Sequence, residues 1–228
     1  MSPLLAIECS QRQGGVAFLN TDGTVHCTRF DPDVRHGDAL LPTIDSLLRS
    51  AGCTPRELGG CGVSLGPGGF TGLRVSTATC KSMGLALGIP IYGIPSALVV
   101  ASSIAEERSK MIVALAGKGE GAWLTGVECH DGCWTMCRPG ALVSAGEEGD
   151  WFDGASVLVA DEHLPGSLHR AAMERGMEIL PPSWNPEACL ALTRTRHGAG
   201  DADQVHALQP IYPRVPEAVS IWQARKQG

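Results

Sequence analysis

The 228-residue sequence has few charged side chains and no run of basic ones. Lys and Arg number 18 against 24 Asp and Glu, which gives a formal net charge of -6 and a pI near 5.6. No stretch interleaves aromatic with basic residues. A protein that binds nucleic acid by itself needs a basic surface. The composition therefore argues against that class of protein.

The sequence also lacks a secretion signal and an uninterrupted membrane-length apolar run. No charged region stands ahead of the short apolar run at the N-terminus. Residues 82–105 carry no charge, but Gly88, Pro90, Gly93 and Pro95 divide them into a helix end, a strand and a helix start. We therefore expect a soluble cytoplasmic protein that does not associate with a membrane.

Nine cysteines are scattered along the sequence without the spacing of a disulfide framework. Their odd number and the lack of a secretion signal indicate that the thiols are reduced. Cys129, Cys133 and Cys137 lie beside His130, but the Asp-Gly pair at 131–132 predicts a hairpin turn. Across it, one face holds the histidine and two cysteines, and the other face holds Cys129. Three ligands are one short of a structural zinc site. We interpret these cysteines as small hydrophobic residues and predict no metal site.

The sequence contains neither the HExxH motif of metallopeptidases nor a serine nucleophile elbow, which argues against a peptidase of either kind. A glycine-rich loop at 66–69 instead joins an apolar strand to a proline-free segment. Free N–H groups at a helix start can bind an anion, but Leu73-Arg74 stands where a Walker loop needs Lys and Ser or Thr. We interpret the loop as structural or partner-facing. The weaker alternative is an anion or nucleotide site, which would use Glu8, Ser10, Gly66, Gly68 and Gly69.

The hydrophobic pattern predicts alternating strands and helices in two halves. The first half comprises strands at 3–9, 15–19, 24–30, 62–65 and 91–94 and helices at 36–51, 70–87 and 96–107. The second comprises strands at 111–116, 122–128, 133–138, 156–160 and near Ile179, a helix at 166–175, and a helix from N-cap Asn185 to Gly198. Since each half opens with three strands, we infer an internal duplication. We expect a first lobe of residues 1–108, completed by segment 208–228, and a smaller second lobe of residues 109–207.

This order of elements is that of the two-lobed α/β fold of actin, Hsp70 and the sugar kinases. Within that superfamily the sequence resembles the TsaB (YeaZ) family of glycoprotease-like proteins. The matching stretches are LLAIECS at 4–10, RHGDALLPTIDSLLRSAG at 35–52, GVSLGPGGFTGLRVSTATCKSMGLAL at 62–87 and LQPIYPRVPEAV at 208–219. The resemblance is dense over residues 1–100 and thin over 110–205.

The resemblance implies a non-catalytic subunit in bacterial tRNA threonylcarbamoyladenosine synthesis. Such a protein binds and activates a catalytic paralogue, TsaD, which modifies the adenosine next to the anticodon of ANN-decoding tRNAs. A small ATPase, TsaE, joins the same assembly. ATP and a metal are then expected on the partner subunits, and tRNA binds only through the complex. The alternative is a nucleotide-dependent enzyme of the same fold or a peptidase-like protein acting alone.

In the resembling family, the helices that match 36–51 and 70–87 form the heterodimer face and can also form a homodimer. On this chain small residues recur at helical spacing along the second helix, which permits close approach of another helix. The alternative is that both helices pack only on their own sheet. The expected interface residues are Leu40, Leu41, Ile44, Leu48, Gly72, Arg74, Ser76, Thr79 and Met83.

Two departures from the family pattern concern the cleft. Glu8 stands where the family usually carries Asp, and Ala116-Gly117-Lys118 stands where it usually shows an acidic run. With one carboxylate lengthened and the other absent, we do not expect Mg–ATP chemistry in this chain. His36 matches a family histidine, and we interpret it as a helix-start residue with a local hydrogen bond.

Overall fold

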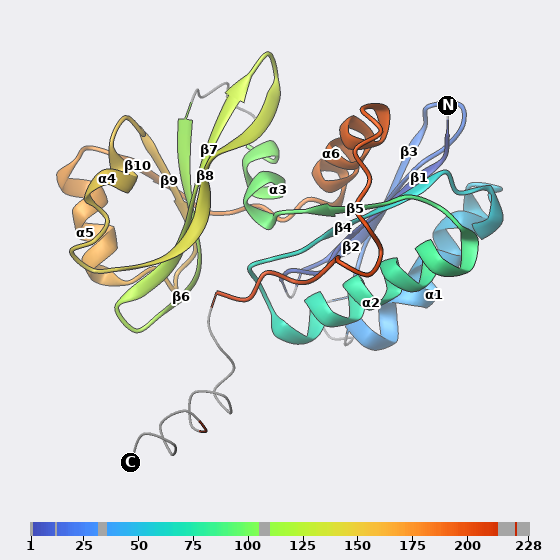
Figure 1. The fold of residues 1–228 in the computed structure, drawn as a ribbon, viewed down its shortest axis with the longest axis horizontal. Coiled ribbons are helices and arrows are strands. Elements are labelled where there is room, and N and C mark those ends of the chain that lie inside the picture. The colour runs from blue at the N-terminus through green and yellow to red at the C-terminus, as the bar shows by residue number, and fades with distance from the viewer. Residues whose placement is uncertain (1, 12, 32–35, 105–109, 214–221, 223–228) are drawn as a thin grey trace.

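The structure, a computed structural model, describes residues 2–11, 13–31, 36–104, 110–213 and 222. Two lobes each contain a five-stranded mixed sheet (Figure 1). The strand orders are β3-β2-β1-β4-β5 and β10-β9-β6-β7-β8. Strands β6 to β10 thus occupy the same relative places as β1 to β5. This repetition confirms the duplicated, two-lobed α/β fold of the actin, Hsp70 and sugar-kinase type that the order of elements predicts.

The first lobe opens with an antiparallel meander, β1 (Leu4–Glu8), β2 (Gly15–Leu19) and β3 (Val25–Arg29). Parallel strands β4 (Gly60–Ser64) and β5 (Ile91–Ile94) complete its sheet. All but β3 are buried along their whole length, as expected for a sheet covered on both faces.

Helices α1 (His36–Ser50) and α2 (Phe70–Leu87) cover one face of this sheet, and a single 3-10 turn, η1 (Pro55–Glu57), follows α1. The left-handed Gly88, with φ 67°, ends α2. Both helices begin where the sequence predicts. The expected helix at 96–107 is α3 (Ser96–Ser102), and residues 105–107 of that prediction lie outside the described residues.

The second lobe has the meander β6 (Lys110–Lys118), β7 (Gly121–His130) and β8 (Cys133–Ser144), then β9 (Val157–Ala160) and β10 (Glu178–Leu180). Helices α4 (Gly149–Phe152) and α5 (Gly166–Glu174) pack on one face. The β7–β8 turn has positive φ at Asp131 and Gly132, as predicted. Strand β8 runs through Pro139, beyond its expected end, because an edge strand tolerates a missing N–H.

The last helix, α6 (Pro186–Gly198), belongs in space to the first lobe, which corrects the expected boundary of 109–207. Its buried residues pack with side chains of β1, β2 and β5 on the face opposite α1 and α2. Gly62 of β4 permits the close approach, because a Cβ there would lie 1.8 Å from the Thr193 hydroxyl oxygen. Helix α3 packs on the second sheet instead, so it lies between the two lobes.

The chain beyond α6 returns across the first lobe. Asp203 forms a bridge with Ile91, Leu208 is buried in the first lobe's core, and the Ile211 N–H donates to the Leu65 carbonyl at 2.8 Å. Residues 208–213 therefore lie on the first lobe. Of the remaining segment, 214–228, only residue 222 is described. Among the described helices, none is long and apolar enough to cross a membrane.

Candidate functional site

An apolar groove of about 560 Å³ runs between α1 and α2 on the outer face of the first lobe. The two helices lie side by side there (Figure 1), and small residues on α2 leave room between them. Leu41, at one side of the groove, is 60% exposed. The lining residues are Leu41, Ile44, Asp45, Leu48, Pro55, Ala78, Thr79, Ser82, Met83, Ala86 and Leu87.

Five of the nine expected interface residues line this groove, and they come from both helices. They are Leu41, Ile44, Leu48, Thr79 and Met83. The side chains of Ile44 and Leu48 are almost wholly buried, so they form its floor rather than its rim. The structure therefore brings together residues that lie more than 30 positions apart in the sequence.

Three other expected interface residues face inward. Leu40 is buried in the core of the first lobe, and Gly72 and Ser76 are buried residues of α2. For Leu40 the structure agrees with the alternative in which the helices pack on their own sheet. The ninth residue, Arg74, is exposed near the start of α2 and stacks on the ring of Phe70.

The glycine-rich loop uses most of its backbone donors within the protein. The Gly66 N–H donates to the Ser96 hydroxyl at 3.0 Å, and the Gly69 N–H donates to the Ser10 carbonyl at 2.6 Å. Pro67 has no N–H. A Cβ on Gly68 would lie 2.0 Å from the Ser10 carbonyl oxygen, so this glycine permits close contact between two backbones. These contacts favour the structural interpretation of the loop over an anion site.

Glu8, at the end of β1, turns its carboxyl group into the protein. The side chain is fully buried, and one carboxyl oxygen accepts hydrogen bonds from the Ser10 N–H at 2.7 Å and from the Ser10 hydroxyl. Burial raises the pKa of Glu8, and interactions with Ser10 and Ser64 offset only part of that rise. A buried carboxyl with a raised pKa is poorly suited to hold Mg²⁺ and a nucleotide phosphate.

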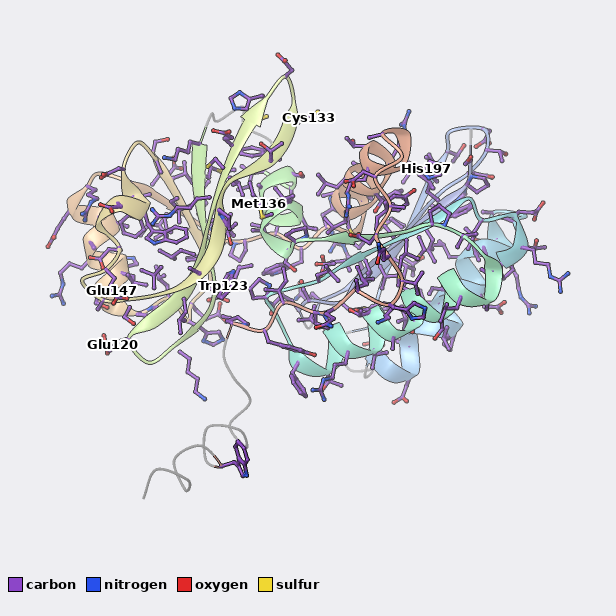
Figure 2. All side chains as sticks on the ribbon, viewed as in Figure 1. Glu120, Trp123, Cys133, Met136, Glu147 and His197 are labelled. Carbon is purple, nitrogen blue, oxygen red and sulfur yellow. The ribbon has the colours of Figure 1, made fainter. Side chains whose placement is uncertain are left out.

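The corresponding end of β6 in the second lobe offers no carboxylate in its place. Ala116 adopts a positive φ of 53°, and a Cβ on Gly117 would lie 2.2 Å from the His163 carbonyl oxygen. Glu120, the nearest acid along the chain, is exposed at the β6–β7 turn and accepts a hydrogen bond from Ser167 at 3.3 Å (Figure 2).

The hairpin cysteines do not gather into a cluster of ligands. His130 faces Cys133 across the turn and Cys129 faces Trp134, as predicted, and Figure 2 shows Cys133 near the tip of the hairpin. Within the described ranges, no group of three or more His, Cys, Asp or Glu side chains is placed to hold a metal ion. The His36 side chain lies outside the described residues.

A family model described as TsaD, tRNA N6-adenosine threonylcarbamoyltransferase, matches residues 33–126, which include both groove helices. An uncharacterized protein of Mycobacterium tuberculosis is 30% identical over 183 residues, which cover 80% of this chain and 77% of that protein. The tRNA threonylcarbamoyladenosine biosynthesis protein TsaB of Bacillus subtilis is 25% identical over 96% of this chain and 97% of its own length. TsaB of Escherichia coli is 26% identical over 92% and 94%.

Solved structures show the same fold. YeaZ from Pseudomonas aeruginosa superposes with a TM-score of 0.76 at 21% identity, covering 93% of this chain and all of that one. Another Pseudomonas aeruginosa structure, of an uncharacterized protein with similarity to peptidase YeaZ, superposes with a TM-score of 0.78 at 21% identity over 94% of this chain. The sequence motifs, the relatives and the shared fold together show that this chain belongs to the TsaB (YeaZ) family.

Proposed function

We propose that this chain is a non-catalytic subunit that binds and activates a TsaD-like catalytic paralogue in the biosynthesis of threonylcarbamoyladenosine in tRNA. The relatives named TsaB supply the pathway. In this proposal the paralogue modifies the adenosine next to the anticodon of ANN-decoding tRNAs. The family model that matches 33–126 is itself that of a threonylcarbamoyltransferase, as expected for a paralogue that shares the fold.

The groove between α1 and α2 is the observation that carries the proposal. Its lining is predominantly apolar, and Leu41 and Leu85 are 60% and 61% exposed on these two helices. Leaving this much apolar side chain in water is unfavourable, and patches of this kind mark sites where another protein binds. A helical face with a hollow between two helices suits the side chains of a partner's helices.

The ends of β1 and β6 support a non-catalytic role. Glu8 is buried beneath the glycine loop, and Ala116 stands at the matching end of the second lobe. ATP and a metal therefore belong to partner subunits in this proposal, which include a TsaE-like ATPase. Because the chain carries a net charge of -6, tRNA binds through the assembled complex rather than to this subunit alone. These features give no support to an independent nucleotide-dependent enzyme or a peptidase.

Leu41→Asp tests the groove, with Met173→Asp as a matched control. Met173 lies on α5 of the second lobe and is 58% exposed, so both substitutions put a charge on an exposed apolar position of a helix. Light scattering coupled to size-exclusion chromatography would follow each variant mixed with the TsaD-like paralogue from the same source. We expect the wild type and Met173→Asp to form a mixed complex and Leu41→Asp to lose it.

Equal complex formation by Leu41→Asp would contradict the proposed face, and no complex with the wild type would contradict the proposed function. The same experiment without the paralogue reports on a homodimer. If the homodimer uses the same groove, Leu41→Asp abolishes it too, and the homodimer competes with the functional complex. Gly72→Arg is unsuitable as a test, because Gly72 is buried and the change would disturb the fold itself.

A further inference from the structure

The side chain of Arg74 contacts two aromatic residues that also contact each other. Its guanidinium carbon lies 3.6 Å from the centre of the Phe70 ring and 5.8 Å from that of Tyr212. Its Nε donates a hydrogen bond to the Tyr212 hydroxyl at 3.1 Å. The two rings are themselves 5.4 Å apart. An exposed arginine would otherwise sample many rotamers, so these contacts fix its guanidinium in one place. We call Phe70, Arg74 and Tyr212 the arginine clamp.

The C-terminal segment brings Tyr212 to the start of α2. The ammonium group of Lys81 donates to the carbonyls of His206 and Leu208 at 3.4 and 3.0 Å. Leu208 is buried, and the Ile211 N–H donates to the carbonyl of Leu65, the residue that follows β4. The segment is thus fastened on both sides of Leu208, and Tyr212 follows directly. The arginine clamp is therefore part of the packed first lobe.

The clamp leaves cationic donors facing solvent. Arg74 uses Nε within the clamp, and its terminal nitrogens remain for a planar, bidentate acceptor. No carboxylate among the described residues forms an ion pair with it, and α2 itself contains no acidic residue. Phe70 and Tyr212 are 48% and 38% exposed. Exposed aromatic rings around an arginine are typical of the residues that dominate binding energy in protein interfaces.

We propose that the arginine clamp is the receptor for a carboxylate side chain of the catalytic partner. This inference rests on the proposed function, and it adds a charged anchor to the apolar groove. Arg74 and Ala78 are four positions apart on α2, so the clamp and the groove lie on the same side of the helix. The C-terminal segment therefore contributes to the partner interface through Tyr212.

A carboxylate fits the clamp better than a tRNA phosphate. Nucleic-acid binding needs several cations along a surface. On α2 the other cation, Lys81, is engaged by two backbone carbonyls of its own chain. A single, stacked guanidinium with two parallel donors matches one carboxylate from a protein surface.

Isothermal titration of the TsaD-like paralogue with variants of the full chain tests the inference. We expect Arg74→Glu to weaken binding by about tenfold or more and to reduce the dependence of affinity on salt, because a complementary ion pair becomes a repulsive one. Arg74→Lys keeps the charge but not the stacked, bidentate geometry, so we expect a smaller loss. Arg170→Glu, an exposed position on α5, makes the same charge change away from the clamp and should bind as the wild type does.

The outcomes separate this inference from the proposed function. If the wild type does not bind the paralogue, the proposed function fails. If the wild type binds and Arg74→Glu binds equally well, the clamp inference fails while the function stands. If Arg74→Glu leaves the two-protein complex intact but weakens tRNA binding by the assembled complex, the clamp recognises phosphate, and the carboxylate assignment is overturned. Unfolding midpoints measured for each variant confirm that a loss of binding is not a loss of fold.

Discussion

Replacing Glu8 with glutamine should make this protein more resistant to neutral and alkaline pH. Glutamine has the shape of a protonated glutamic acid and can keep an oxygen for the Ser10 N–H and hydroxyl, which donate to Glu8 in the wild type. It cannot ionise, however. Since the Glu8 side chain is fully buried, the wild type must either hold a proton on this carboxyl or bury a charge.

The direction of this pH dependence of stability follows from the raised pKa of Glu8 in the folded protein. In the unfolded chain a glutamate has a pKa of about 4.3. Below that value both states are protonated, and the favourable burial of the neutral acid is fully present. As the pH rises toward the folded pKa, the wild type loses stability by up to about 1.4 kcal/mol per pH unit, the slope for one proton. Glu8→Gln lacks this slope.

Urea unfolding followed by circular dichroism at pH 5, 6, 7 and 8 measures the difference. The free energy of unfolding of Glu8→Gln should rise relative to that of the wild type as the pH increases. Buried Cys9 and Cys189 lie close to Glu8, but burial raises the pKa of both thiols well above 9.0, so neither should titrate in this range. A constant difference between the two proteins at every pH would refute a buried, protonated Glu8.

Glu57→Gln is a control for which we expect the opposite effect on stability at neutral pH. Glu57 is exposed, and hydrogen bonds from the Thr54 N–H and hydroxyl, both 2.7 Å long, lower its pKa. The stability that it contributes is present above the unfolded pKa and is lost as the pH falls through the folded pKa. At pH 7 the Glu57→Gln variant should therefore be less stable than the wild type, whereas Glu8→Gln should not.

Two glycine substitutions test the close backbone contacts. Gly68→Ala should destabilise the protein by about 1–3 kcal/mol in urea unfolding, because its Cβ would lie 2.0 Å from the Ser10 carbonyl oxygen; an unchanged midpoint would show that the loop yields freely. Gly62→Ala should cost a similar amount, because its Cβ would meet the Thr193 side chain. Adding Thr193→Ala should recover part of that loss, and a purely additive double variant would argue against the α6 contact.

Local signals in the sequence were sufficient for most elements of the first lobe. Gly88 and Pro90 predict the end of α2 and the start of β5. The Asn185-Pro186 pair predicts the start of α6. In the structure the Asn185 side chain accepts a hydrogen bond from the Glu187 N–H at 3.0 Å. The short helix α4 was missed because four residues give no helical periodicity. Strand β8 was cut short because a proline reads as a strand end unless the strand is known to be an edge.

The position of α6 could not be read from chain order. Duplication places a helix after the last strand of each half, and the simplest expectation is that it covers its own sheet. Whether α6 packs on the first or the second sheet depends on Gly60 and Gly62, because the absence of side chains there lets α6 approach β4. It also depends on the apolar face of α6. A glycine in a strand indicates close approach by some other backbone or side chain, but it does not identify which one.

The candidate site was predictable as a pair of helices but not as a surface. The expected interface includes Leu40 with Leu41 and Gly72 with Thr79, yet Leu40 and Gly72 are buried whereas Leu41 and Thr79 line the groove. The arginine clamp was missed, because Tyr212 lies 138 positions from Arg74. The only signal was the expectation that the segment from residue 208 completes the first lobe, and residues 208–213 do lie there.

A series of hydrogen bonds connects the buried carboxyl of Glu8 to the helix that we propose binds the partner. Glu8 accepts from Ser10, and the Ser10 carbonyl accepts from the N–H of Gly69, the N-cap of α2. The next residue is Phe70, which supports Arg74. The Ser10 backbone therefore links the buried carboxyl of Glu8 to the N-cap of α2 and restrains the first turn of that helix. In the proposed function α2 binds the partner, and a helix whose first turn is held in this way loses less conformational entropy when it binds.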